Sequence, residues 1–166
     1  MGTPATEIRD LRPGDWPEVA EIFEEGIRTR NATFETVVPA WKEWDAAHLP
    51  GHRLVVVGAG GVVGWAALSP VSARACYAGV AEDSVYVVPG RQGQGVGRAL
   101  LEELVARSER AGLWTLQTSI FPENDASLAL HEKCGFRIVG MRERIAKRDG
   151  SWRDAVFLER RSKEIT

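Results

Sequence analysis

The chain has 166 residues, of which 44% are hydrophobic and 27% charged, and its formal net charge is −2. These values predict one globular domain over residues 1–166, large enough to build a core without metal or disulfide bonds. A near-neutral chain argues against nucleic acid as the main partner, although a local basic patch stays compatible with it.

The sequence also predicts where the protein resides. No apolar run approaches the roughly 20 residues of a membrane span, and residues 1–10 lack the apolar segment of a secretion signal. We therefore expect a cytoplasmic protein that does not act at a membrane. Cys76 and Cys134 are far apart in the chain, and we expect two reduced, partly buried thiols and no metal site.

The first part of the chain predicts one strand and two helices. Residues 5–11 are expected to form the strand. Pro13-Gly14-Asp15 then opens a helix in which Asp15 is a plausible N-cap. Its apolar positions, Val19, Ile22, Phe23, Gly26 and Ile27, recur at helical spacing. Residues 39–49 predict a second, short helix that ends at Pro50-Gly51.

Three β-rich runs follow these helices. Residues 53–57 and 62–68 are apolar and β-branched, and the glycine-rich residues 58–61 between them predict a hairpin. Residues 69–79 are expected to form a loop. Residues 81–88 predict a third strand that stops at Pro89-Gly90.

The last part of the chain alternates helices and strands. Residues 94–111 form the clearest helical pattern, residues 113–120 predict a strand, and residues 125–133 predict a short helix.

A final hairpin is indicated by residues 136–145 and 152–158, joined across Asp149-Gly150. The whole order is β-α-α-β-β-β-α-β-α-β-β. It predicts an α/β (α+β) fold with a single mixed, mostly antiparallel sheet and helices on both faces.

A glycine-rich turn precedes the clearest helix and reads Arg91-Gln92-Gly93-Gln94-Gly95-Val96-Gly97-Arg98. Glycine lets the backbone approach a ligand closely, and the free N–H groups of a helix's first turn favour an anion. The turn therefore predicts a pyrophosphate site. A glycine-rich strand-to-helix turn that binds no ligand would have the same sequence pattern. It lacks the lysine of a P-loop and the spacing and position of a dinucleotide-binding turn.

Two segments together resemble the GNAT family of acetyl-CoA-dependent N-acetyltransferases. The first is Gln92-x-x-Gly95-x-Gly97, which matches the family pattern Q/R-x-x-G-x-G/A. The second is Asn124-Asp125-x-Ser127-x-x-x-His131-Glu132-x-x-Gly135-Phe136. The predicted element order fits the fold of that family over nearly the whole chain.

Within the family, the chain is similar to the phosphinothricin and methionine sulfoximine acetyltransferases. The similarity is carried by Asn31-x-Thr33-Phe34-Glu35, Arg74 to Tyr77, Glu82-x-x-Val85-Tyr86-Val87, Pro122-x-Asn124-Asp125, Leu130-His131-Glu132 and Gly150-x-Trp152-x-Asp154. It implies acetylation of the α-amine of a small amino-acid analogue by direct transfer in a ternary complex. It also implies a homodimer, for which the six tryptophans could supply surface aromatic side chains, and a link to herbicide resistance.

The resemblance also implies which residues bind acetyl-CoA. The pantetheine arm would pair with Val85, Tyr86 and Val87, and the pyrophosphate would lie on the turn. The turn residues so implicated are Gln92, Gly93, Gln94, Gly95, Val96, Gly97 and Arg98. Asn124 would reach the pantetheine, cap the helix that follows it, or do both.

Two residues match catalytic positions of the family. Glu82 matches the proposed general base, which removes a proton from the amine before attack. A free glutamate has a pKa near ~4.3, so burial or relay through water would help; a solvated loop carboxylate is the alternative. His131 stands where many relatives carry a tyrosine that protonates the departing thiolate. It is expected to be an acid, a base or a positioning group, or else a helix histidine packed beside Cys134.

For the acceptor amine, the candidates are Phe34, Arg74 and Tyr77. An arginine can bind a carboxylate through two hydrogen bonds, and aromatic rings can enclose an aliphatic stem; an exposed loop charge is the alternative for Arg74. Ser72 stands where the phosphinothricin enzymes carry a basic residue, which favours methionine sulfone or sulfoximine at least as much as phosphinothricin. His48 and His52 match no motif and are expected at the surface.

Two other functions remain compatible with the sequence. One is a protein or peptide N-acetyltransferase of the same fold, which an open peptide groove would favour and a closed pocket at Phe34 and Arg74 would not. The other is a non-catalytic acyl-CoA-binding module, against which the presence of Glu82 and His131 argues.

Overall fold

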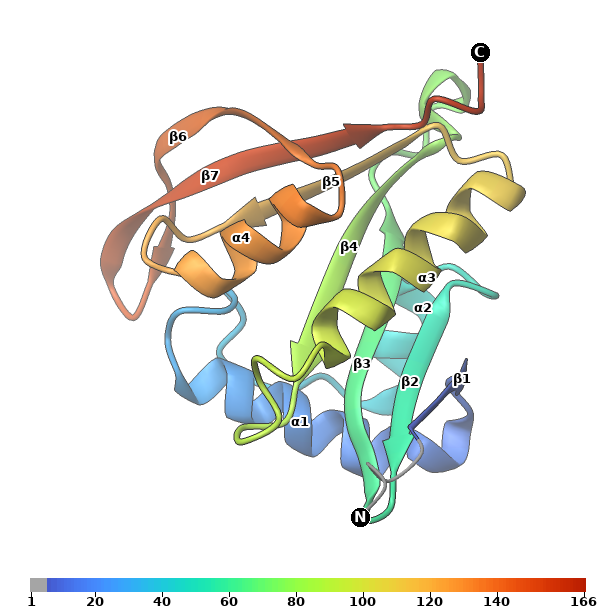
Figure 1. The fold of residues 1–166 in the computed structure, drawn as a ribbon. Helices are drawn as coiled ribbons and strands as arrows, with labels where there is room; N and C mark the ends of the chain where they lie inside the picture. The colour runs from blue at the N-terminus through green and yellow to red at the C-terminus, as the bar shows by residue number, and fades with distance from the viewer. Residues whose placement is uncertain (1–5) are drawn as a thin grey trace.

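The computed structural model describes residues 6–166, which form one seven-stranded sheet with helices packed against it (Figure 1). In chain order the elements are β1 (Glu7–Asp10), α1 (Trp16–Arg28), α2 (Trp41–Ala47), β2 (Arg53–Gly58), β3 (Gly61–Pro70), β4 (Val80–Val87), α3 (Val96–Arg110), β5 (Thr115–Ile120), α4 (Asp125–Lys133), β6 (Arg137–Arg148) and β7 (Ser151–Arg161). The predicted order of helices and strands is confirmed. Short 3-10 turns lie at Pro13–Asp15 and Ala75–Tyr77.

The strands lie side by side in the order β1-β2-β3-β4-β5-β7-β6. β4 and β5 are parallel, and every other neighbouring pair is antiparallel. This confirms the mixed, mostly antiparallel sheet. The crossover between the two parallel strands contains α3, because parallel neighbours cannot be joined by a tight turn. No described helix is both long and apolar enough to cross a membrane.

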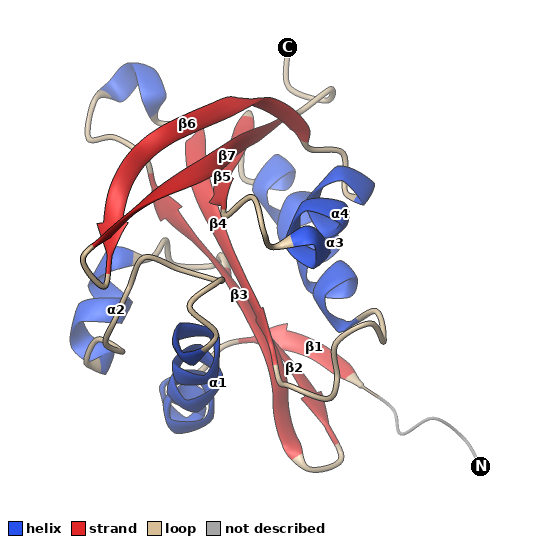
Figure 2. Ribbon diagram, turned by 90° about the vertical axis from the view of Figure 1, so that its left-hand side faces the viewer, coloured by secondary structure: helices blue, strands red, loops and turns tan. Residues whose placement is uncertain are grey.

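Two apolar clusters, one on each face of the sheet, hold the helices in place. Side chains alternate between the faces along β2: Leu54 and Val56 pack in the cluster that contains α3, and Val55 packs in the cluster that contains α1. Figure 2 shows α1 and α2 on one side of the sheet and α3 and α4 on the other. The prediction of helices on both faces is confirmed.

The predicted and observed boundaries differ mainly next to turns. The helix predicted over residues 94–111 begins at Val96, because Gly95 has a φ of +84°, a left-handed conformation that a right-handed helix excludes. The strand predicted over residues 5–11 is observed at Glu7–Asp10, and residue 5 lies outside the described residues. The final hairpin turns at Asp149-Gly150 as predicted, and both residues have a positive φ.

Asp15 occupies the N-cap position of α1, as predicted, but its side chain makes no capping hydrogen bond to that helix. Its carboxylate instead accepts hydrogen bonds from the Arg9 guanidinium at 2.7 and 2.8 Å and from the Arg12 N–H at 2.7 Å. The Arg9 guanidinium accordingly holds the pKa of Asp15 below its usual value. The carboxylate therefore stabilises the turn between β1 and α1.

His48 and His52, which were expected at the surface, are both partly buried. The His48 ring stacks on Trp44 with 4.1 Å between ring centroids, and its Nδ1 lies 2.6 Å from the Trp44 carbonyl oxygen. Burial lowers the pKa of both histidines. These rings belong to the packing around α2 and β2.

Five of the six tryptophans are buried or partly buried rather than the expected surface aromatics. Trp44 and Trp65 are 2% and 1% exposed, three others are partly buried, and Trp152 is exposed at 56%. Cys76 is exposed rather than partly buried, Cys134 is partly buried, and both are free thiols. Of the tryptophans, only Trp152 therefore adds to the exposed apolar surface that a second copy could cover.

Candidate active site

β4 and β5 pair only at their first residues and then separate. The paired positions are Val80 with Thr115, Ala81 with Leu116 and Glu82 with Gln117. β4 stays paired with β3 on its other side as far as Val87. From Asp83 to Val87, one edge of β4 therefore has no partner strand among residues 6–166. Such an edge offers N–H and C=O groups to an extended ligand that carries amides.

A groove of about 690 Å³ runs along this open edge to the start of α3. The predicted cofactor residues that line it are Val85, Tyr86, Val87, Gln92, Gly93, Gly95, Gly97, Arg98 and Asn124. Two other predicted residues do not line it. Gln94 donates a hydrogen bond from Nε2 to the Gly90 carbonyl at 3.1 Å, and Val96 is buried in the core beneath α3.

The glycines of the turn allow the groove to have its observed shape. Gly93 and Gly95 have φ values of +75° and +84°, which other L-residues rarely adopt. A Cβ on Gly97 would lie 3.3 Å from Leu130 Cδ2. Gly97 and Arg98 of the first turn of α3 line the groove, and the N–H groups of a helix's first turn have no partner within the helix and favour an anion. The guanidinium of Arg98 is already bonded to Glu102 at 2.7 Å.

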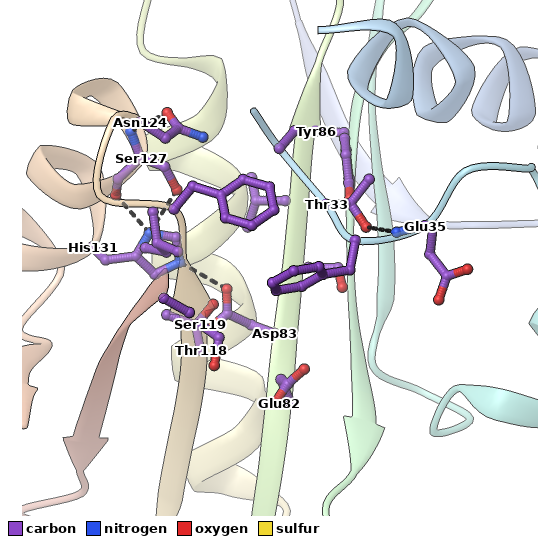
Figure 3. Close-up of a pocket in the computed structure, with 17 residues that line it drawn as sticks. Thr33, Glu35, Glu82, Asp83, Tyr86, Thr118, Ser119, Asn124, Ser127 and His131 are labelled. Carbon is purple, nitrogen blue, oxygen red and sulfur yellow. Dashed lines mark hydrogen bonds and ion pairs between the residues drawn. The ribbon is translucent and has the colours of Figure 1, made fainter. Parts of the chain in front are cut away.

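A second, smaller cavity of about 240 Å³ opens where the strands separate (Figure 3). It is lined by Glu82 to Tyr86 of β4, Thr118 to Phe121 of β5 and its end, residues 32–35 of the α1–α2 loop, and Ser127 and His131 of α4. Ala32, Val85, Tyr86, Asn124 and Ser127 line both the groove and this cavity. The two spaces therefore adjoin at these residues.

Glu82 lies on the wall of the small cavity and is partly buried. Burial raises the pKa of its carboxyl group, and the charge of Asp83 adds to this effect. The Gln117 amide, which donates to Glu82 Oε2 at 3.3 Å, and the charge of Arg142 act in the opposite direction. Because the net shift is upward, this carboxylate is a stronger base than an exposed glutamate.

His131 is held by a buried partner that the sequence did not indicate. Its Nε2 lies 2.8 Å from Asp83 Oδ2, and its Nδ1 lies 2.8 Å from the Ser127 carbonyl oxygen (Figure 3). His131 and Asp83 are 3% and 5% exposed. A carbonyl can only accept, so Nδ1 carries a proton, and an Nε2–H that donates to Asp83 makes the ring a cation. Both ring nitrogens are therefore occupied.

The charge state of His131 is set by competing effects. Burial lowers the pKa of the imidazole, but the charge of Asp83, its hydrogen bond and the Ser127 carbonyl together raise it above the usual value. The other oxygen of Asp83, Oδ1, is buried without a partner among the described residues.

Asn124 caps α4, which is one of the two roles predicted for it. Its Oδ1 accepts from the Ser127 N–H at 3.2 Å, and its Nδ2 donates to the Asn31 carbonyl at 3.1 Å. The cap thereby connects α4 to the loop between α1 and α2, and it does so at the place where groove and cavity adjoin.

Arg148, at the end of β6, holds the same loop from the other side. Its buried guanidinium donates to the carbonyl oxygens of Ile27 at 2.7 Å and Glu35 at 2.9 Å, and also to that of Thr33. Arg153 adds a bond to the Arg30 carbonyl at 2.9 Å. No sequence pattern indicated this role, because Arg148 ends a strand whose other side chains are nearly all exposed.

The structure places only one of the three predicted acceptor residues at the cavity. Phe34 lines it and packs edge-on against Phe121, with 4.7 Å between ring centroids. Arg74 and Tyr77 are exposed in the β3–β4 connection and lie outside both linings, where Arg74 sits 5.6 Å over the Tyr77 ring. Phe121, Thr118 and Asp83 were not expected. Alternation along β4 is the signal that could have found Asp83, since it places this carboxylate among apolar residues facing the core.

Comparisons with known proteins agree with this geometry. Residues 7–136 match the model of the Acetyltransferase (GNAT) family. The chain is 36% identical to the phosphinothricin N-acetyltransferase of Alcaligenes faecalis, over 94% of this chain and 82% of that protein. It is 31% identical to an L-methionine sulfoximine/L-methionine sulfone acetyltransferase of Pseudomonas paraeruginosa, over 93% of this chain and 94% of the relative.

A solved structure extends the comparison to the fold. The crystal structure of a GNAT superfamily phosphinothricin acetyltransferase from Sinorhizobium meliloti, in complex with AcCoA, matches with a TM-score of 0.87 at 30% identity. The match covers 97% of this chain and 90% of that one. The chain therefore belongs to the GNAT acetyltransferase family and is an acetyl-CoA-dependent N-acetyltransferase. The predicted family, enzyme class and cosubstrate are confirmed.

Replacing Asp83 by asparagine should lower the pKa of His131, because the carboxylate charge that stabilises the imidazolium is removed. In the wild type, the raised pKa means that the pair stabilises the fold fully below the usual histidine value of ~6.5 and loses that contribution as the pH rises through the folded-state value. An NMR titration of the His131 ring measures the shift. Asp125→Asn, an exposed change on the helix that carries His131, is the control. An unchanged His131 pKa in Asp83→Asn would contradict the ion pair.

Replacing Arg148 by glutamine should destabilise the protein by about 2 kcal/mol or more, because three backbone carbonyls lose a charged donor. Hydrogen exchange should accelerate at residues 29–35 before it does so in the sheet. Denaturant unfolding and amide exchange measure the two effects. Arg137→Gln, at an exposed ion pair on the same strand, should stay within about 0.5 kcal/mol. Equal effects of the two changes would refute a special role of Arg148.

Proposed function

We propose that the enzyme transfers the acetyl group of acetyl-CoA to the α-amine of a small amino-acid analogue, of the phosphinothricin, methionine sulfoximine or methionine sulfone type. The observation that carries this proposal is the meeting of a glycine-lined groove with a small cavity that contains Glu82. One space then receives the cosubstrate and the other the acceptor. Direct transfer in a ternary complex follows, because both reactants are held side by side at the junction.

In this proposal the groove residues bind acetyl-CoA by backbone contacts. The open edge of β4 at Val85, Tyr86 and Val87 pairs with the pantetheine amides, and the turn from Gln92 to Arg98 binds the pyrophosphate. The positive φ values of Gly93 and Gly95 and the open space beside both glycines fit such a ligand. When bound, acetyl-CoA supplies an activated thioester carbonyl. Val96 shapes the turn from the core side and makes no contact of its own with the groove.

Glu82 is the proposed general base. An amine arrives largely protonated near neutral pH and must lose a proton to attack. Glu82 accepts that proton, directly or through a water, as the nitrogen bonds to the acetyl carbon and the bond from that carbon to sulfur breaks. Its raised pKa and its position on the cavity wall both suit this role.

His131 is proposed as a positioning residue rather than as the acid that protonates the leaving thiolate. Both of its ring nitrogens are occupied, by Asp83 and by the Ser127 carbonyl. A free thiol has a pKa near ~8.5, so the thiolate can leave with little help from an acid. The buried pair fixes α4, and with it Asn124 and Ser127, against β4.

The size and walls of the acceptor cavity favour a small substrate. Its volume is about 240 Å³, and the edge-to-face rings of Phe34 and Phe121 form part of its wall. An extended peptide would need an open groove on this side. The names of the two relatives from Alcaligenes and Pseudomonas specify substrates of this small class.

The test is release of free CoA from acetyl-CoA across a panel of amines. The panel contains methionine sulfone, methionine sulfoximine, phosphinothricin, ordinary amino acids and short peptides. We expect turnover of a sulfone, sulfoximine or phosphinothricin, with kcat/KM reduced about a hundredfold or more in Glu82→Gln. In the wild type, kcat/KM should fall as the pH drops through a Glu82 pKa above the usual ~4.3, because protonation removes the base.

Other outcomes of this panel would overturn parts of the proposal. Turnover of peptides alone would replace the small acceptor by a protein substrate. Binding of acetyl-CoA without turnover of any amine would indicate a sensor. Full activity of Glu82→Gln would remove Glu82 from the mechanism.

We further propose that the enzyme is a homodimer that uses the β6–β7 hairpin. β6 is an edge strand and exposes Ile138, Val139, Met141 and Ile145, beside Trp152 of β7. Exposed apolar side chains along an edge favour association. Light scattering should give twice the chain mass for the wild type and for Val71→Glu, an exposed change elsewhere, and a monomer for Met141→Glu. A monomeric wild type would refute the dimer.

A further inference from the structure

The acceptor cavity carries negative charge but lacks a cation that could receive a carboxylate. Glu35, Glu82 and Asp83 line it, whereas its described lining contains neither arginine nor lysine. His131 is already paired with Asp83. These carboxylates suit the amine of an amino acid. The carboxylate of the same molecule would be repelled unless a cation lies at the mouth of the cavity.

Arg142 is on β6, next to the strand β7 that contributes Ala155 to the cavity wall. It lies directly opposite Ala155 of β7, which lines the cavity, and directly opposed residues of antiparallel strands share a face of the sheet. Its guanidinium lies 4.2 Å over the Phe157 ring. Phe157 in turn pairs with Ser119, another residue of the lining. Arg142 thus sits on the face of the sheet onto which the cavity opens.

The charge of Arg142 reaches Glu82. Among the charged groups that perturb the pKa of Glu82, Arg142 is the one that lowers it. Exposed Arg144, two residues further along β6, has no such effect. The Phe157 ring holds the Arg142 guanidinium by a cation–π contact, which leaves its N–H groups free.

Arg142 has no acidic partner in the described part of the chain, unlike Arg137 of the same strand and Arg153 of β7. Arg137 pairs with Glu159, and Arg153 pairs with Glu123. Within residues 6–166, Arg142 makes no ion pair or side-chain hydrogen bond. An unpaired guanidinium in a fixed position is suited to a carboxylate, which it can bind through two parallel hydrogen bonds.

We propose that Arg142 binds the carboxylate of the acceptor while Glu82 receives the proton from its α-amine. This inference rests on the proposed function and names the residue that makes the site selective for amino acids over simple amines. Binding of the acceptor carboxylate was expected of Arg74, which lies outside the cavity. The proposal assigns this role to Arg142 of β6 instead.

The test compares two acceptors with the full-length enzyme. One is methionine sulfone, and the other is methylsulfonylpropylamine, the same molecule without its carboxylate. In Arg142→Gln, kcat/KM for the sulfone should fall about tenfold to a hundredfold, as expected for a lost hydrogen bond to a charged group. The value for the decarboxylated amine and the KM for acetyl-CoA should stay at the wild-type level.

Two further variants sharpen the comparison. Arg142→Lys keeps the charge but loses the planar pair of donors, and it should recover part of the loss. Arg144→Gln removes another exposed arginine from the same strand and should behave like the wild type on both acceptors.

The outcomes separate this inference from the function on which it rests. Wild-type activity of Arg142→Gln toward the sulfone would overturn the role of Arg142 and leave the proposed function standing. An equal loss with both acceptors would also overturn it, because the effect would then not depend on the carboxylate. A wild-type enzyme that acetylates no carboxylate-bearing acceptor would overturn the proposed function and this inference together.

Discussion

The separation of β4 from β5 after Glu82 and Gln117 is the constraint on which the rest of the site depends. A sheet that stayed paired to its strand ends would leave neither an open edge for the cosubstrate nor a cavity for the acceptor. The open edge of β4 must be kept away from β5, because unpaired strand edges tend to pair with a neighbouring strand. Helix α4 does this on one face, and the loop between α1 and α2 does it on the other (Figure 3).

Each of these two supports is fixed by polar contacts over long sequence distances. The Asp83–His131 pair joins β4 to α4, and the Arg148 guanidinium joins the end of β6 to the α1–α2 loop. Glu82 and Asp83 are adjacent, yet strand alternation turns their side chains to opposite faces. The Asp83 carboxylate is therefore paired with His131, whereas the Glu82 carboxylate keeps a raised pKa and can exchange a proton with an acceptor.

The sequence could predict those features that depend on residues close together in the chain. The order of elements came from periodicity and turn residues, and helix α4 has the predicted bounds, because Asn124 caps its start and Gly135 with positive φ follows its end. The turn before α3 was recognisable because its glycines are close together in the chain. The partner of His131 lies 48 residues away, and Arg148 contacts residues 113 to 121 positions away. No spacing rule reports such contacts.

The same difference explains why the acceptor residues were predicted less well than the cosubstrate residues. The predicted residues that line the groove lie in one continuous stretch, from β4 through the turn into α3, together with Asn124. Residues of α1, the α1–α2 loop and α4 complete the groove, and these were not predicted. The acceptor side instead combines the α1–α2 loop, the end of β5 and the β6–β7 hairpin, which meet only in the folded chain. Changes in these three segments alter the wall of the cavity without moving the glycine turn. Selectivity for the amine can therefore diverge among related chains while the groove for acetyl-CoA is kept.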